Sequence, residues 1–161
     1  MKTIYMVRHA KSSWAHDVID HQRPLKERGK KDCQLVSSAV AQLLVKPDKI
    51  ISSDAKRALT TALYFKEALS VDTSNFITNH ELYDFVGQGV MKVLAGLDNA
   101  LDSVLLVGHN HAFTSIANML GSKYFDNVPT CGFLMLEFDT DTWSKVKAGV
   151  TKKVIFPRDL K

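Results

Sequence analysis

Short apolar runs of strand length alternate with longer amphipathic stretches along this chain, and this alternation constrains the fold more than any other feature. Two runs, Thr3–Val7 and Ser103–Val107, contain no charged residue. Strands that are uncharged along their whole length are typical of parallel sheets that helices cover on both faces. The sequence therefore predicts an α/β fold, with a single three-layer α/β/α domain over residues 1–161 and a mostly parallel sheet.

The remaining elements follow without a low-complexity linker or an internal repeat. Apolar residues recur with helical spacing in four segments, which predicts helices at about 30–44, 58–69, 90–97 and 112–120. Further runs of β-forming residues predict strands at 49–52, 75–77, 132–138 and 143–150. The last two are expected to pair as an antiparallel hairpin. Ser53 or Asp54 is expected to cap the second helix.

Basic side chains follow the carboxyl ends of three predicted strands. Arg8 and His9 come after the first, His109 follows another, and Arg57 lies one helical turn beyond the third. Ligands of open parallel sheets bind beyond the carboxyl ends of the strands, so we expect these side chains to share one rim. Arginine matches phosphate oxygens with paired N–H donors, and histidine can act as a nucleophile or base near pH 7. The pattern predicts an anion site, with phosphate as the expected anion.

Three stretches at these strand ends have the spacing of known motifs: Val7–Trp14, Ser52–Ala62 and Val107–Asn110. Together they resemble the Arg-His-Gly, Ser-x-x-x-Arg-Ala-x-x-Thr-Ala and Gly-His signatures of the histidine phosphatase superfamily, also called the phosphoglycerate mutase-like family. Ala10 stands where that family usually has glycine. The stretch Asp20–Leu25 is closer still to the SixA-type phosphohistidine phosphatases. The resemblance implies a phosphoglycerate mutase-like fold.

The resemblance also implies a role for each residue of the group. His9 would be the nucleophile that becomes transiently phosphorylated, with its other ring nitrogen held by an acceptor such as a backbone carbonyl. Arg8, Arg57 and His109 would bind the phosphoryl oxygens and stabilise their charge in the transition state. Further substrate contacts would come from Arg23 and Ser12.

The general acid is open at this point. Broad-specificity members of the family carry a carboxylic acid that protonates the leaving oxygen; Asp84 fits that position best, Glu81 is the second candidate, and the site could also lack one. An oxygen leaving group with a conjugate-acid pKa of about 15.7, the value of water, departs badly without an acid. An imidazole, with a pKa of about 6.5, can depart already protonated. A site with a poor acid would therefore favour phosphohistidine over alkyl phosphates.

We therefore expect a phosphatase that works through a phosphohistidine enzyme intermediate, with a phosphohistidine-bearing protein as its substrate and a place in signal transduction. One alternative is a small-molecule phosphomonoesterase of the same superfamily, which would take a small phosphorylated substrate. The other is a non-catalytic relative that uses the same residues to bind phosphate. A phosphoglycerate mutase fits less well, because it normally needs insertions that enclose a sugar-acid phosphate.

Composition limits the partners. The net charge of +4 is modest, and the basic clusters lack interleaved aromatic residues, so we expect no nucleic-acid partner. No uncharged apolar stretch reaches the roughly 18 residues of a membrane span, and the apolar run near the start is too short for a signal peptide, so we expect a cytoplasmic monomer with no membrane partner.

No cofactor and no metal are expected from the sequence. His16, His21 and His80 fall in predicted loops, and no carboxylate pair or cysteine set completes a coordination sphere around His109 and His111. The two cysteines lie far apart in the sequence and are expected to be reduced and buried.

Overall fold

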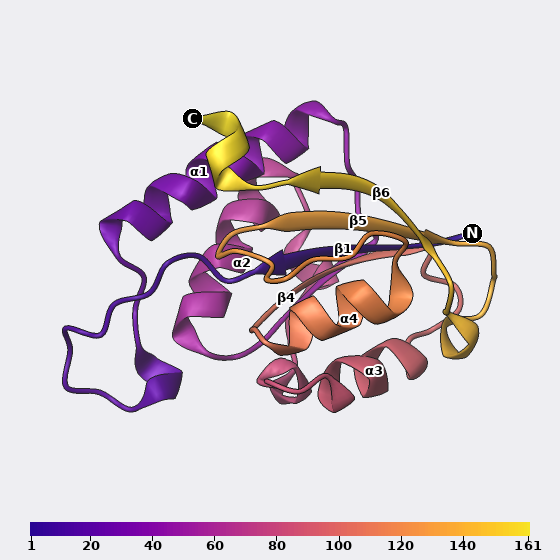
Figure 1. The fold of residues 1–161 in the computed structure, drawn as a ribbon, viewed down its shortest axis with the longest axis horizontal. Helices are drawn as coiled ribbons and strands as arrows, with labels where there is room; N and C mark the ends of the chain where they lie inside the picture. Colours follow the sequence, from indigo (N-terminus) through magenta and orange to yellow (C-terminus); the bar gives the residue numbers. More distant parts are fainter.

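A computed structural model describes residues 1–161 and contains one six-stranded sheet with the strand order β3-β2-β4-β1-β5-β6 (Figure 1). The strands are β1 (Lys2–Arg8), β2 (Lys49–Ser52), β3 (Phe76–Thr78), β4 (Ser103–Gly108), β5 (Phe133–Phe138) and β6 (Val150–Ile155). Strands β1 to β4 are parallel to one another. Strand β5 is antiparallel to β1, and β6 is antiparallel to β5. This mixed, largely parallel sheet confirms the predicted α/β architecture.

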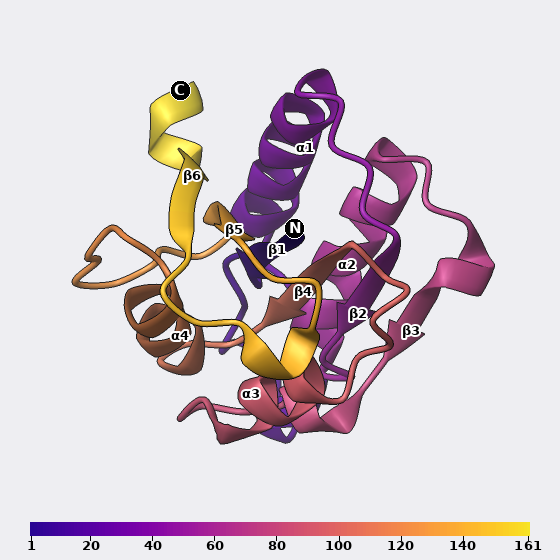
Figure 2. The same cartoon turned by 90° about the vertical axis from the view of Figure 1, so that its right-hand side faces the viewer.

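Helices cover both faces of the sheet (Figure 2). The helices are α1 (Glu27–Gln42), α2 (Lys56–Ala68), α3 (Gln88–Ala95) and α4 (Ala112–Leu120). The pair α1 and α2 contributes to one buried apolar cluster and the pair α3 and α4 to another, so the layers are helix, sheet, helix. None of these helices combines the length and the apolar character that crossing a membrane requires.

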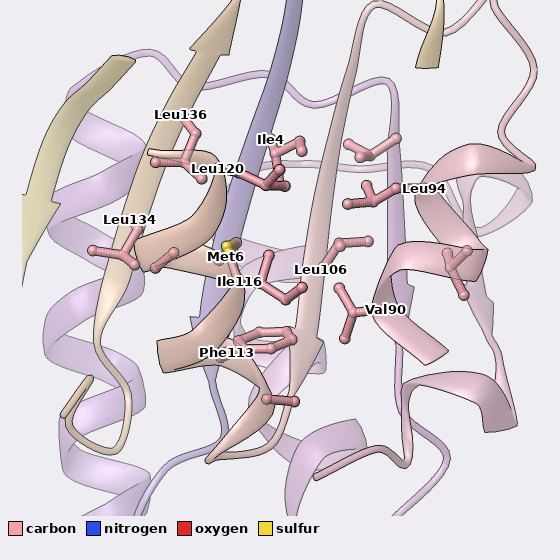
Figure 3. Packing of buried hydrophobic residues seen from close by; sticks show 14 of the residues in the cluster. Ile4, Met6, Val90, Leu94, Leu106, Phe113, Ile116, Leu120, Leu134 and Leu136 are labelled. Carbon is pink, nitrogen blue, oxygen red and sulfur yellow. The ribbon is translucent and has the colours of Figure 1, made fainter. Parts of the chain in front are cut away.

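Side chains of the central strand β1 alternate between the two cores. Ile4 and Met6 pack in the cluster on the side of α3 and α4 (Figure 3), whereas Tyr5 and Val7 pack with α1 and α2. This alternation follows from the two-residue period of a strand. Each fully buried side chain of this size contributes about 1.5–3 kcal/mol. Because β1 is packed on both faces, the residues at its carboxyl end have a fixed position.

The last strand begins later than the sequence predicts. β5 pairs with Val150–Ile155 instead of with residues 143–150. Trp143 is fully buried in the short 3-10 helix η4 (Trp143–Lys145), where its indole N–H donates to the Leu101 carbonyl oxygen at 2.9 Å. Its backbone N–H donates to the Asn99 side chain at 2.9 Å. Docking of this large side chain against a distant loop overrides the local strand preference.

The start of α2 also differs from the prediction. The residue before it is Ala55, and no side chain caps the helix from that position. The Ser53 hydroxyl accepts the Ala55 N–H at 3.2 Å, while the Asp54 carboxylate turns toward two histidines. The Ser53 hydroxyl also contacts His109 Nε2 at 2.8 Å, so both residues make contacts across the rim of the sheet.

Candidate active site

The two histidines at the strand ends are neighbours because of the strand register. Pairing of β1 with β4 sets Arg8 opposite Gly108, so the next residues, His9 and His109, leave the sheet side by side. The His9 backbone N–H donates to the Gly108 carbonyl oxygen at 3.0 Å. The centroids of the two imidazole rings lie 5.2 Å apart. The structure thus brings these residues to one rim.

One ring nitrogen of His9 is held and the other is available. Nδ1 of the buried ring lies 2.8 Å from the Ala10 carbonyl oxygen. A carbonyl only accepts, so Nδ1 carries the proton and Nε2 keeps its lone pair. Burial, together with the positive neighbours Arg57 and Arg8, lowers the pKa of His9 well below its ordinary value. The ring is therefore neutral near pH 7 and has the form that a nucleophile needs.

His109 offers a buried donor without a partner. Its Nε2 lies 2.8 Å from the Ser53 hydroxyl oxygen, which also accepts the Ala55 N–H. No other acceptor lies within reach of the Ser53 hydroxyl proton, so this proton is assigned to the bond with Nε2, which puts the proton of the neutral ring on Nδ1. That Nδ1 is buried and has no hydrogen-bond partner. Burial and the nearby Arg57 lower the pKa of His109 to about 3, so the ring is neutral near pH 7.

Two guanidinium groups complete the set of unsatisfied donors. Arg57, on α2, is 2% exposed, and Arg8 donates from Nη1 to the Val128 carbonyl oxygen at 2.8 Å. The Nε atoms of Arg8 and Arg57 and the Nδ1 atom of His109 are the only buried side-chain polar atoms of the protein that lack a partner. A buried donor without an acceptor costs about 1–3 kcal/mol. Their gathering at one rim indicates that this rim, hereafter the cradle, binds an anion.

Asp20 orients the cradle, and the sequence alone assigned it no role. Its carboxylate accepts hydrogen bonds from Arg57 Nη2 at 2.9 Å, Arg23 Nε at 3.0 Å and the Tyr83 hydroxyl at 2.6 Å. Partial burial opposes ionisation of Asp20, but the bonds from Tyr83, Arg57 and Arg23 outweigh it and hold the pKa well below its usual range. The one available signal was the three-residue spacing of Asp20 and Arg23, which suits a shared turn.

A crossing of two loop segments positions Arg23. Ser12 pairs with Leu25 as an isolated antiparallel bridge, and Arg23 Nη1 donates to the Ser12 hydroxyl at 2.8 Å. Gly29 makes this crossing possible, because a Cβ atom there would lie 2.3 Å from the Lys11 carbonyl oxygen. The Arg23 guanidinium also lies 3.5 Å from the ring centroid of Trp14. Arg23 therefore joins the site through Asp20, and the Ser12 hydroxyl serves it as an acceptor.

Asp84, the first candidate for the general acid, caps a helix. Its carboxylate accepts the backbone N–H groups of Val86, Gly87 and Val90 at distances of 3.0 to 3.2 Å, at the start of α3. Partial burial raises the pKa of Asp84, but these backbone bonds outweigh burial and lower it. An ionised cap has no proton to give near pH 7, so these bonds support a structural part for Asp84, and its assignment as the general acid stays a prediction. The exposed Glu81 pairs with Lys92 at 3.1 Å.

An open, largely polar cleft of about 450 Å³ lies beside the cradle. Its lining includes His80, Tyr83 and Lys92. The Tyr83 ring also lies 5.3 Å from the His109 ring, centroid to centroid, so one aromatic side chain separates the cleft from the cradle. A ligand in the cleft would thus lie next to the buried donors.

Comparison with known proteins adds a family match. The profile of the histidine phosphatase superfamily (branch 1) matches residues 4–82. An uncharacterized chloroplastic protein of Arabidopsis thaliana is 24% identical over an alignment of 156 positions that covers 91% of this chain and 71% of the relative. An uncharacterized protein of Mycobacterium tuberculosis is 25% identical over an alignment of 160 positions that covers 93% of this chain and 98% of the relative.

Solved structures share the fold over almost the whole chain. A candidate phosphohistidine phosphatase SixA from Agrobacterium tumefaciens superposes with a TM-score of 0.82 at 24% identity, covering 97% of this chain and 98% of the other. A protein histidine phosphatase SixA in complex with tungstate gives a TM-score of 0.82 at 20% identity, covering 99% of each chain. The fold is thus phosphoglycerate mutase-like, as the motifs implied.

Proposed function

The chain belongs to the histidine phosphatase superfamily, and from this premise we propose that it is a phosphatase that removes the phosphoryl group from phosphohistidine in proteins. The observation that carries the proposal is the state of His9. This residue is buried and neutral, its Nδ1 is held by the Ala10 carbonyl, and its Nε2 is free beside three unsatisfied donors.

The reaction has two displacements at phosphorus. In the first, the His9 Nε2 lone pair forms a bond to phosphorus while the bond from phosphorus to the substrate imidazole breaks. The substrate ring carries a proton on its other nitrogen, so it departs as a neutral imidazole that keeps the electron pair of the broken bond. In the second, a water molecule attacks phosphorus, the His9–phosphorus bond breaks, and inorganic phosphate leaves with His9 restored.

The cradle stabilises the charge that develops on the phosphoryl oxygens. His109 Nδ1 and the Nε atoms of Arg8 and Arg57 are buried N–H donors that need an acceptor in the folded protein. Fixed donors of this kind contribute about 10²–10³-fold each to a rate, because they need no reorganisation during the reaction. A phosphoryl group carries three oxygens that can accept these hydrogen bonds.

The hydrogen bonds and ion pairs that the nearby carboxylates make support a substrate with a nitrogen–phosphorus bond. Asp84 is a helix cap, Glu81 pairs with Lys92, and Asp20 is held ionised by its arginine and tyrosine partners. The lowered pKa values of Asp84 and Asp20 keep both ionised near pH 7, and the Glu81 carboxylate is engaged by Lys92. An imidazole leaving group needs no acid from the enzyme, because its conjugate-acid pKa is about 6.5. An alkoxide does need one, so this site favours phosphohistidine.

The structural neighbours also support a phosphohistidine substrate. Two of them carry the name SixA, one as a candidate phosphohistidine phosphatase and one as a protein histidine phosphatase that holds tungstate. Tungstate is an oxyanion, which is the class of ligand that the unsatisfied donors of the present chain require. The cleft of about 450 Å³ could hold a small ligand too, so a small-molecule phosphomonoesterase is the second candidate.

A substrate panel separates these candidates. We expect hydrolysis of a phosphohistidine peptide and of phosphoramidate, with little release of phosphate from glycerol phosphate, and a labelled phosphoenzyme after rapid acid-free quenching. A preference for glycerol phosphate would favour the phosphomonoesterase. Binding of phosphate without turnover of any substrate would identify a non-catalytic relative.

A further inference from the structure

Three ligand-type side chains meet beside the cradle, and the proposed reaction uses none of them. They are His21 in the 3-10 helix η1 (Asp20–Gln22), Asp54 before α2, and His80 in the 3-10 helix η3 (His80–Leu82). Their ligand atoms all lie within 4.8 Å of one another. His21 is 33 positions from Asp54 in the sequence and His80 is 26 positions from it, so the fold alone brings them together.

We propose that His21, Asp54 and His80 form a binding site for a divalent transition-metal ion of the zinc class. Two imidazoles and one carboxylate with an open fourth position are the donor set of several catalytic zinc sites. Magnesium and calcium prefer oxygen ligands throughout, whereas imidazole suits zinc, nickel, copper and iron. The donor set therefore selects the metal class.

The distances suit this ion with little rearrangement. Both histidines contact the same carboxylate oxygen: Asp54 Oδ1 lies 2.9 Å from His21 Nε2 and 3.1 Å from His80 Nδ1. Bonds of about 2.0–2.1 Å to a tetrahedral zinc ion place neighbouring ligand atoms about 3.4 Å apart. Each histidine therefore has to move away from this oxygen by about half an ångström or less, and the two ring nitrogens, which lie within 4.8 Å of each other, have to approach to the same spacing. The exposed position of His80, at 73%, gives it room to do so.

The proton balance is that of ordinary metal binding. Without metal, a ring N–H bridges each histidine to the Asp54 carboxylate. With metal, His21 Nε2 and His80 Nδ1 each supply a lone pair, and any proton on these atoms moves to the other ring nitrogen or to solvent. The Gln22 side-chain amide lies 3.1 Å from His21 Nδ1, so its oxygen can accept that proton once the amide turns over.

The location gives the ion a defined relation to the cradle. The Tyr83 ring lies 5.0 Å from the His21 ring and 5.3 Å from the His109 ring, centroid to centroid. His80 also lines the cleft beside the cradle. A doubly charged ion held by a single carboxylate leaves one net positive charge there. This charge would attract a phosphorylated substrate to the cleft without taking part in the displacement at His9.

Zinc binding to the metal-free full-length protein tests the proposal without any substrate. We expect one zinc ion per chain, measured by competition with a chromophoric chelator, and an affinity at least about tenfold lower in His80→Ala. His16→Ala is the matched control, because His16 is an exposed loop histidine outside the cluster and its loss should leave binding unchanged.

A second variant separates this cluster from the catalytic histidine pair. His9→Ala should bind zinc as tightly as the wild type, and cobalt(II) should give the visible spectrum of a four-coordinate site that disappears in His80→Ala. Equal zinc affinity of the wild type and a folded His80→Ala would overturn the proposal and leave the cluster as a hydrogen-bonded trio. Loss of binding in His9→Ala with retention in His80→Ala would overturn it as well. The result does not depend on phosphatase activity.

Discussion

Both ends of β1 carry a buried or half-buried cation, and the two cations differ in whether their buried N–H groups have hydrogen-bond partners. At the amino end, Lys2 is 1% exposed, and its ammonium donates to the Asn99 and Leu101 carbonyl oxygens at 2.6 and 2.7 Å. It also lies 3.5 Å from the Asp102 carboxylate, so it has three acceptors for three protons. At the carboxyl end, Arg8 keeps a buried Nε without a partner.

This difference distinguishes a structural cation from a functional one. A saturated buried ammonium stabilises the folded chain and has no capacity left for a ligand. An unsatisfied buried guanidinium lowers stability and keeps that capacity. Both side chains belong to the same strand and the Nε atom of Arg8 is itself buried, so the contrast lies in the partners that each end offers. The buried donor without a partner therefore locates the function at the carboxyl end of β1.

The strongest test of that location is His9→Ala. Without the nucleophile, turnover of a phosphohistidine peptide should fall by at least about 10⁴-fold, and the labelled phosphoenzyme should vanish. Rapid-quench assays with circular dichroism as the folding control measure both. Substantial turnover by a folded variant would remove His9 from the reaction.

Arg8→Met tests the unsatisfied end of β1. Removal of a donor to the transition state should lower kcat/KM by about 10²–10³-fold. The free energy of unfolding should change by less than about 1 kcal/mol, because the variant loses one bond to Val128 but also loses an unpaired buried donor. Steady-state kinetics and denaturant unfolding decide this. A large fall in the free energy of unfolding with unchanged kcat/KM would show that Arg8 is a structural cation and not a functional one.

Lys2→Met is the matched change at the saturated end. The Asn99 and Leu101 carbonyl oxygens would lose their donor, so the free energy of unfolding should fall by about 2–4 kcal/mol. The value of kcat/KM should stay at that of the wild type at a temperature where the variant is folded. A selective fall in kcat/KM would show that the two ends of β1 are coupled.

Asp20→Asn should give a smaller effect, because Asp20 is a positioning residue. The amide can still accept a bond but no longer neutralises the buried Arg57, so we expect kcat/KM to fall by about tenfold and inhibition by inorganic phosphate to change. Tyr83→Phe removes one bond to Asp20 and should have a lesser effect of the same kind. Unchanged phosphate inhibition in Asp20→Asn would show a purely structural role.

Acid should destabilise the cradle end through its neutral histidines. The pKa values of His9 and His109 lie below the value of about 6.5 in an unfolded chain, so the unfolded state binds more protons as the pH falls below that value. Stability should therefore decrease between pH 7 and pH 5, by roughly 2 kcal/mol from His109, and His9 should contribute in the same direction. Denaturant unfolding of the wild type and His9→Ala at both pH values checks this. Equal pH dependence in both proteins would contradict it.

The sequence by itself determined the layers of the sheet and the place of the cradle. The uncharged runs within β1 and β4, and the short apolar run of β2, are recognisable because a strand buried on both faces has little room for polar side chains. Once these strands are parallel, their carboxyl ends must meet, so His9, His109 and Arg57 could be assigned to one rim before any coordinate was known.

Only the tertiary structure decided which polar partners surround that rim. Asp20, Tyr83 and the cluster of His21, Asp54 and His80 come from loops and single turns, which have no periodicity to read. Asp84 is a further example. The sequence does not show whether a carboxylate caps a helix or is free to act as an acid, because this depends on which N–H groups reach it. Contacts between loops far apart in the sequence are set by the packed elements that hold the loop ends, and local residue patterns carry little information about them.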